Sequence, residues 1–176
     1  MDRAMRGLWN VKTKYIQKAL VTSLNKIGAE VVTQAKRELK DATGLKAGVV
    51  GKKIKKDKAR KGDETYSIYM KSRYLNAIEF GARQTKKGVS AKIWNIRKNY
   101  KGAFIGSGRN SGKQLVFGKS KKKKNKLKAL HGASLPREFH REDMEKMFNM
   151  KIKKRFPILF KRALYLHLMK AQSRLR

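Results

Sequence analysis

Ile78-Glu79-Phe80-Gly81-Ala82-Arg83-Gln84-Thr85-Lys86-Lys87-Gly88-Val89 opens a stretch, residues 78–139, in which short apolar pieces are separated by glycines and polar turns. Three further pieces follow in order: Gly102-Ala103-Phe104-Ile105, Leu115-Val116-Phe117-Gly118, and Leu130-His131-Gly132-Ala133-Ser134-Leu135-Pro136-Arg137-Glu138-Phe139. Short apolar runs bounded by turn residues are typical of β-strands. The stretch therefore predicts a β-rich centre, and the flanking sequence decides what packs on it.

Alternation of apolar residues in and just before this stretch predicts four strands. They lie at residues 66–70, 89–97, 103–105 and 115–117. In the second strand, Trp94 falls opposite the apolar face, so we expect its side chain to be exposed. The link between the last two strands, residues 106–113, is rich in Gly and Ser and predicts a hairpin tip.

Both flanks of the strands predict helices. Over residues 11–40 the apolar positions recur every three or four residues: Ile16, Leu20, Leu24, Ile27, Val31, Ala35 and Leu39. Asp41-Ala42-Thr43-Gly44 ends this pattern, and a short helix is expected at residues 46–54. After Pro136 the chain is helical again, and Pro157 must kink or restart that helix. We therefore predict an α+β fold, with a long N-terminal helix packed on a small antiparallel β-sheet and with C-terminal helices.

The length and the charge of the chain indicate how many domains it has and what kind of partner it binds. A chain of 176 residues is expected to form a single domain over residues 1–176. Its 47 Lys and Arg against 12 Asp and Glu give a formal charge of +35, which calls for an anionic partner. Nucleic acid is the most common such partner, an acidic protein surface the next, and a membrane surface the third. No apolar run is long enough to span a membrane, so we expect no membrane partner.

The positive charge is concentrated in two basic loops, residues 52–62 and 119–128. Each is either a solvated loop or a surface that contacts backbone phosphates without reading sequence. The candidate DNA and phosphate contacts are Lys52, Lys53, Lys55, Lys56, Lys58, Arg60, Lys61, Lys121, Lys122, Lys123, Lys124 and Lys126.

The sequence contains no convincing motif for catalysis or for binding a cofactor. Residues 106–114 resemble a phosphate-binding loop, but Gln114 stands where a magnesium-holding hydroxyl is needed. His140-Arg141-Glu142-Asp143 suggests a metal site, yet metal hydrolysis needs several convergent ligands, and acids also suit the first turn of a helix. The chain has no Cys, which excludes thiolate sites. We expect no cofactor, no metal and no enzyme activity.

Taken in order, the pieces between residues 73 and 139 resemble the phage minor tail protein Z family. The matching segments are Phe80–Val89, Gly102–Ile105, Val116–Gly118 and Leu130–Pro136, and the long first and last helices also fit. The sequence departs from the family pattern at residues 119–128. There the family has an Arg-containing stretch and a Leu-Pro-Ile-like piece that lead to a Gly-Pro-Ser-like turn.

The resemblance implies a structural virion protein of a tailed phage, which completes the tail and joins it to the head connector near the genome end. Implied partners are the tail terminator, the connector and the genomic DNA backbone. It also implies a homo-oligomeric ring, for example a hexamer, located in the virion after assembly in the host cytoplasm. Candidate interface residues are Arg83, Lys86, Lys87 and Trp94.

Two alternatives stay open at this point. A non-viral, ribosome-associated nucleic-acid-binding module explains the charge equally well, but it does not explain the ordered match. An enzyme acting on nucleic acid is the third possibility, and it would depend on Glu142 or His140.

Overall fold

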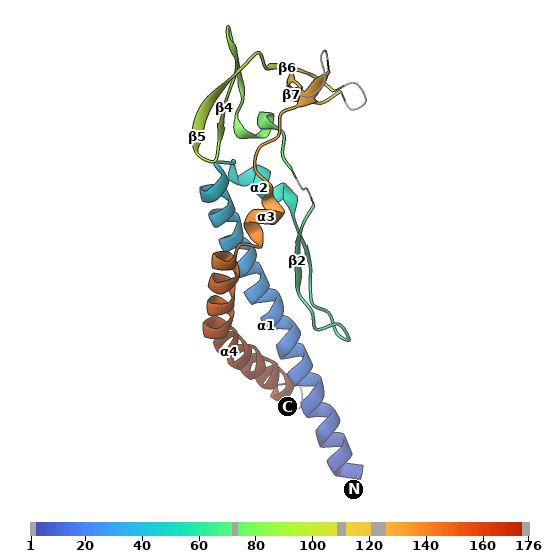
Figure 1. Cartoon of the computed structure of the whole chain (residues 1–176). Helices are drawn as coiled ribbons and strands as arrows, with labels where there is room; N and C mark the ends of the chain where they lie inside the picture. The colour runs from blue at the N-terminus through green and yellow to red at the C-terminus, as the bar shows by residue number, and fades with distance from the viewer. Residues whose placement is uncertain (1–2, 72–73, 109–111, 121–125, 174–176) are drawn as a thin grey trace. The chain divides into compact units, whose positions relative to one another are not determined.

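The computed structural model describes residues 3–71, 74–108, 112–120 and 126–173, with side chains from residue 13 onward. Its elements in chain order are α1(Arg3–Thr43), α2(Ala47–Lys53), β1(Ile54–Asp57), β2(Ser67–Met70), a 3-10 helix η1(Ala77–Phe80), β3(Arg83–Thr85), β4(Gly88–Ile93), β5(Ile96–Lys101), β6(Phe104–Ser107), β7(Gln114–Lys119), β8(Leu127–Ala129), α3(Leu135–Phe139) and α4(Glu142–Gln172) (Figure 1). The predicted α+β class is confirmed.

The chain divides into two compact units. Unit 1 comprises Met1–Thr33, Lys56–Tyr69 and Glu142–Arg176, and unit 2 comprises Gln34–Lys55 and Met70–Arg141. The boundaries fall inside α1 and inside the two-stranded β1–β2 ribbon, so both elements contribute to both units. Whether the two units fold as the one domain expected from length stays a prediction.

Unit 1 is a pair of long helices, α1 and α4, that lie side by side (Figure 1). The buried apolar side chains of these helices in unit 1 range from Ala to Phe: Ala19, Ile27, Val31, Val32, Met144, Phe148, Leu159 and Ala163. Arg155 of α4 joins Glu30 of α1 through two hydrogen bonds of 3.0 and 3.2 Å. These bonds hold the pKa of Glu30 below its ordinary value. Pro157 lies inside α4, which continues through it with a visible bend, as Pro removes one helix hydrogen bond (Figure 1).

The β1–β2 ribbon is fixed to α1 at two points within unit 1. The Asn25 amide donates to the Ala59 carbonyl and accepts from the Ala59 N–H, both at 3.0 Å. Three residues further along α1, Gly28 leaves room for Tyr66, whose ring atoms lie 2.4 Å from where a Cβ would stand. Burial there raises the pKa of Tyr66. The ribbon tip, near Arg60 and Asp63, is therefore held close to α1.

Unit 2 contains two antiparallel three-stranded sheets, in the orders β3-β4-β5 and β6-β7-β8. The buried Asn76 joins η1 to the second sheet, because its side chain bonds both backbone groups of Val116 at 2.8 and 3.2 Å and accepts from the Ile78 N–H at 3.1 Å. The unit's core is formed by fully buried aliphatic side chains: Leu39, Leu45, Val50, Leu75, Val89, Val116 and Leu135.

Three sequence predictions need correction. The strand expected over residues 89–97 is two strands, because Trp94 and Asn95 form a tight turn with φ of 56° and 59°. The strands form three small sheets, where one was expected. Residues 52–62 are not a loop throughout, since Lys52 and Lys53 end α2 and residues 54–57 form β1.

The long helix is confirmed and ends at Thr43, where Gly44 takes the left-handed conformation (φ 75°) that predicts a helix end. The short second helix is confirmed as Ala47–Lys53, and the hairpin formed by β6 and β7 is also confirmed. Its link is shorter than the expected 106–113, because Gly106 and Ser107 pair within β6, and residues 109–111 lie outside the described residues. Among the described residues, no helix has the length and apolar character that crossing a membrane requires.

Candidate nucleic-acid interface

The first basic block is spread over three local structures. Lys52 and Lys53 lie in the last turn of α2, Lys55 and Lys56 lie in β1, and the rest of the block leads to the ribbon tip. Because side chains alternate along a strand, Lys55 and Lys56 point to opposite faces of the ribbon. The block therefore does not present all its amines to one ligand.

Within unit 2, three lysines of the block lie together. Lys52, Lys53 and Lys55 line a cavity of about 530 Å³, together with Val49, Lys71 and Glu79. Lys53 is partly neutralised, because its amino group lies 3.3 Å from the Glu79 carboxylate. Sequence reasoning missed Lys71, which follows β2 and donates its backbone N–H to the Lys53 carbonyl at 3.0 Å. Three amines remain there without an ion pair to any described acid.

Within unit 1, the remaining cations of the block are exposed. Lys56, Lys58, Arg60 and Lys61 all lie at the surface, and no described acidic side chain forms an ion pair with them. Asp57, Asp63 and Glu64 belong to the same ribbon, so the net charge of this tip is lower than that of the block counted alone. Because of these acidic residues, we expect the ribbon tip to attract anions less strongly than the basic residues of the block alone would.

The second block is described only at its edges. Lys119 ends β7, Lys126 is exposed, and the Ser120 N–H donates to the Lys126 carbonyl at 2.9 Å. Lys121, Lys122, Lys123 and Lys124 lie outside the described residues. The block belongs to the β7–β8 connection, and its role in binding stays a prediction.

The four candidate interface residues fall at two places. Arg83, Lys86 and Lys87 are exposed on the β3–β4 hairpin, whereas Trp94 lies at the opposite end of β4. At about 3.3 Å per residue, β4 separates the two sites by roughly 20 Å. Trp94 is 43% exposed, as expected, but because of its turn rather than strand alternation.

Trp94 instead lines a cavity of about 580 Å³ within unit 2. Tyr74 and Arg137 are among the other residues that line it, and Arg141 there pairs with the buried Glu138 at 3.3 Å. Aromatic residues and arginines at the edge of a hollow are the side chains that most often anchor a protein partner. The geometry is that of a contact site more than of a catalytic one.

The part of the chain that the structure describes contains no metal-binding site, since no three His, Asp or Glu side chains lie close enough together to hold an ion. Glu142 and Asp143 form the first turn of α4, which is the helix-start role weighed for them above.

Comparison with known proteins adds one positive finding. No curated protein and no solved structure matches the chain. Residues 1–170 match the sequence model described as prophage minor tail protein Z (GPZ), a family of structural tail proteins rather than enzymes. The match spans nearly all of both units, and it removes the support for an enzyme acting on nucleic acid. The chain therefore belongs to the prophage minor tail protein Z (GPZ) family, as a virion component whose partners are other tail proteins.

Proposed function

We propose that this tail protein completes the tail and joins it to the head connector, beside the end of the packaged genome. The observation that carries the proposal is unneutralised charge. The chain has 47 Lys and Arg and only 12 Asp and Glu, so 35 basic groups stay without an acidic partner in the chain even if every acid forms an ion pair. A structural protein with so much free positive charge is suited to a position beside polyanionic DNA.

The DNA contacts would be made by the exposed lysines and arginines of the two basic blocks. The described amines of the first block lie on a helix end, a strand and the ribbon tip, and these described residues form no shared groove that would read base edges. Such contacts are to backbone phosphates and do not depend on sequence. The proposed binding is therefore tight at low salt and weakens steeply as salt rises.

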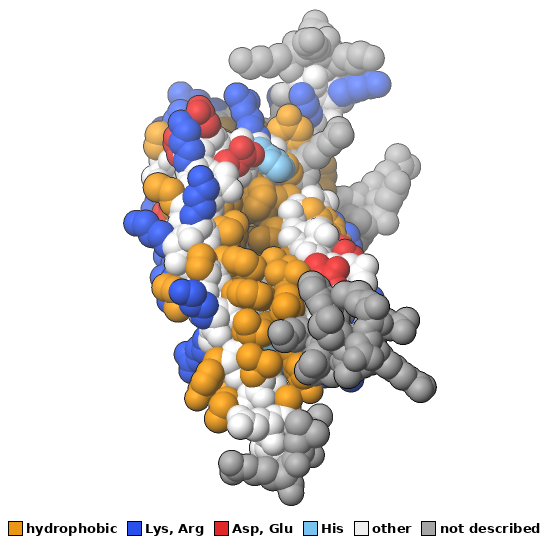
Figure 2. Space-filling view, turned by 90° about the horizontal axis from the view of Figure 1, so that it is seen from below, with side chains coloured by type: hydrophobic (Ala, Val, Ile, Leu, Met, Phe, Trp, Pro, Cys, Tyr) orange, Lys and Arg blue, Asp and Glu red, His pale blue; other side chains and the backbone are white. Residues whose placement is uncertain are grey.

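Protein contacts would use less charged surfaces, because two copies of a strongly basic chain repel each other through their lysines. On α4, Ile158, Tyr165 and Met169 are 57%, 62% and 47% exposed and share one helix face by their spacing of seven and four. Figure 2 shows hydrophobic side chains gathered on one face of the molecule, with basic side chains along its side. We assign the copy–copy contact of a ring to this face of α4, and contacts with the terminator or connector to Trp94 and the Arg83–Lys87 hairpin.

Imaging of the intact particle by electron microscopy tests the placement directly. Density for this chain at the top of the tail, against the portal, would support the proposal and give the copy number of the ring. Density elsewhere along the tail would overturn the junction placement, while leaving family membership untouched.

The DNA contact has its own test on the purified protein, with neighbouring lysines as a matched pair. Lys52→Gln removes an amine without an ion pair, and Lys53→Gln removes one already paired with Glu79. Both variants lose the same net charge. We expect the slope of log affinity against log salt for duplex DNA to fall by about one unit for Lys52→Gln and by less for Lys53→Gln. Equal slopes in both variants and the wild type would exclude this cavity from the DNA contact.

A further inference from the structure

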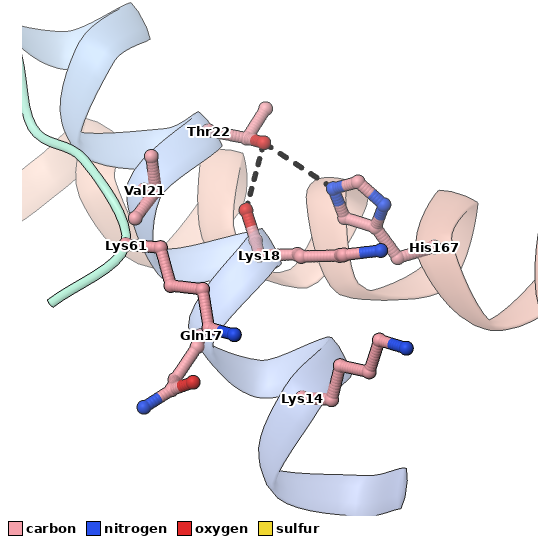
Figure 3. Close-up of a pocket in the computed structure, with 7 residues that line it drawn as sticks. All are labelled: Lys14, Gln17, Lys18, Val21, Thr22, Lys61 and His167. Carbon is pink, nitrogen blue, oxygen red and sulfur yellow. Dashed lines mark hydrogen bonds between the residues drawn. The ribbon is translucent and has the colours of Figure 1, made fainter.

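A pocket of about 210 Å³ in unit 1 has no role in the contacts described above (Figure 3). Three elements that are distant in sequence form its wall. Helix α1 provides Lys14, Lys18, Val21 and Thr22, the ribbon tip provides Lys61, and α4 provides His167. Of these residues, only Lys61 belongs to a basic block identified from sequence.

The basic side chains are brought together at some electrostatic cost. Lys14 and Lys18 are four residues apart on α1, a spacing at which like charges destabilise a helix. In Figure 3 both side chains extend toward the helix that carries His167. Lys61 is added from the ribbon, which the Asn25 clamp on Ala59 holds to α1. An anion between these amines would convert the repulsion into attraction.

A hydrogen-bonded pair fixes the far side of the pocket. The Thr22 hydroxyl donates its one hydrogen to the Lys18 carbonyl at 2.8 Å, so its oxygen must accept from the His167 Nε2–H at 3.2 Å. The imidazole is thereby oriented, and Nδ1 faces away from Thr22. The pairing therefore places the His167 imidazole at the pocket, besides the lysine amines and the Thr22 hydroxyl.

The charge around the pocket is not neutralised by the protein. No acidic residue lines it, and none of its three lysines forms an ion pair with a described Asp or Glu. The Lys18 amino group has one other contact, with the Tyr15 ring at 5.9 Å from its centroid. Val21 and the lysine methylenes form an apolar lining between the charged groups. A single anion with more than one negative charge matches this set.

We propose that this pocket binds a phosphate monoester. Such a group carries about −1.5 to −2 charges at neutral pH, against −1 for each phosphate inside a nucleic-acid strand. The volume of about 210 Å³ is well above the roughly 10–15 Å³ that a single water needs, which leaves room for a phosphate with part of its hydration. A terminal phosphate projects from its strand and can enter a pocket, whereas an internal one is flanked by two sugars. The inference does not depend on where the protein sits in the particle.

The source of the phosphate is either a free small molecule or the 5′ end of a DNA strand. Titration calorimetry in low salt distinguishes them with four probes: inorganic phosphate, a nucleoside 5′-monophosphate, a duplex with 5′-phosphates, and the same duplex without them. Lys14→Gln and Lys18→Gln each remove one of the three lysine charges of the pocket. Lys26→Gln is the matched control, since Lys26 is an exposed lysine on α1 of unit 1 that does not line the pocket.

We expect each pocket variant to weaken binding of the monoester probes about fivefold, and the control variant to change it less than twofold. Preference for the 5′-phosphorylated duplex over the plain one, lost in the pocket variants, would identify a strand end as the source. Binding of the small probes alone would identify a free phosphate. An equal loss in all three variants, or no monoester binding by the wild type, would overturn the proposal. Circular dichroism checks that the surface substitutions leave the helices intact.

Discussion

The two units of the protein use the same side chain to hold two segments together, and they use it in different surroundings. In unit 2 the buried Asn76, 8% exposed, bonds the N–H and carbonyl of Val116. In unit 1 the half-buried Asn25 bonds the N–H and carbonyl of Ala59. A lost hydrogen bond costs more where water cannot replace it. The same device therefore fixes the sheet unit more firmly than it fixes the ribbon on α1.

The close contacts made by glycines differ in the same way. A Cβ at Gly88 would stand 2.1 Å from the Tyr100 carbonyl oxygen, which belongs to the paired strand. The three atoms nearest to a Cβ at Gly28 all belong to the Tyr66 ring, the closest at 2.4 Å. Backbone in a sheet cannot move without breaking the ladder, whereas a side chain can rotate. At these two glycines, unit 2 is therefore packed backbone to backbone, and unit 1 is packed by a side chain against a helix.

The largest effect is expected from a glycine pair that tests this difference. Gly88→Ala places a Cβ against backbone at a φ of 146°, so we expect a loss of about 2–4 kcal/mol in the free energy of unfolding. Gly28→Ala displaces Tyr66 but gains helix propensity, and should stay within about 1 kcal/mol of the wild type. Chemical denaturation measures both values.

Gly48→Ala is the control for the glycine pair, because Gly48 lies in α2 and nothing stands within 4 Å of its Cβ position. It should stabilise the protein slightly. If Gly28→Ala costs as much as Gly88→Ala, Tyr66 is fixed as rigidly as the sheet, and the comparison between the units fails.

The asparagine pair is expected to give intermediate effects. Asn76→Ala leaves the Val116 and Ile78 N–H groups without their acceptor, while the Val116 carbonyl keeps its bond from the Leu130 N–H, and we expect a cost of about 2–3 kcal/mol. Asn25→Ala leaves the Ala59 N–H and carbonyl without these bonds at a part-buried site, and we expect a cost of about 1 kcal/mol. Hydrogen exchange should show faster exchange confined to the ribbon in Asn25→Ala.

Asn99→Ala, at an exposed position of β5, controls for the loss of an amide as such. A cost for Asn25→Ala that equals or exceeds that for Asn76→Ala would show that burial does not set the strength of these two contacts.

Local patterns predicted what local interactions determine. The α1 helix, its end at Gly44 and the hairpin formed by β6 and β7 depend on neighbouring residues, and all three are confirmed. The predicted apolar stripe of α1 is buried at Ile27, Val31, Ala35 and Leu39, whereas Ile16 is exposed. The turn at Trp94 and Asn95 was missed because Trp has no turn preference. Its backbone conformation is held from far along the chain, by the Thr43 carbonyl, which accepts from the Trp94 N–H, and by the Asn95 side chain, which donates to the Asp41 carbonyl.

The sites were predicted less well for the same reason. Counting charges along the chain found Lys52 and Lys55, but it joined them to lysines on the opposite face of the ribbon. It did not find the pocket of Lys14, Lys18 and His167, since only the packing of α1 with α4 brings these residues together. The spacing of four between Lys14 and Lys18 was the one signal available in the sequence.

The smallest effect is expected where unit 1 is joined by an exposed ion pair, Glu30 with Arg155. Hydrogen bonds from Arg155 lower the pKa of Glu30 from its ordinary 4.5, so the folded state holds the ionised carboxylate more strongly than the unfolded state does. The stabilisation is therefore complete above about pH 4.5 and is lost as pH falls through the lower pKa of the folded state. We expect Glu30→Gln to be slightly less stable than the wild type at neutral pH, and this difference to disappear in acid and to shrink with added salt.

Glu38→Gln, which removes an acid from α1 that forms no ion pair with a described cation, controls for the change in net charge. Unfolding curves recorded from pH 3 to 7 decide the matter: a Glu30→Gln difference that persists unchanged at low pH would mean that packing, and not the ion pair, joins α4 to α1 at this point.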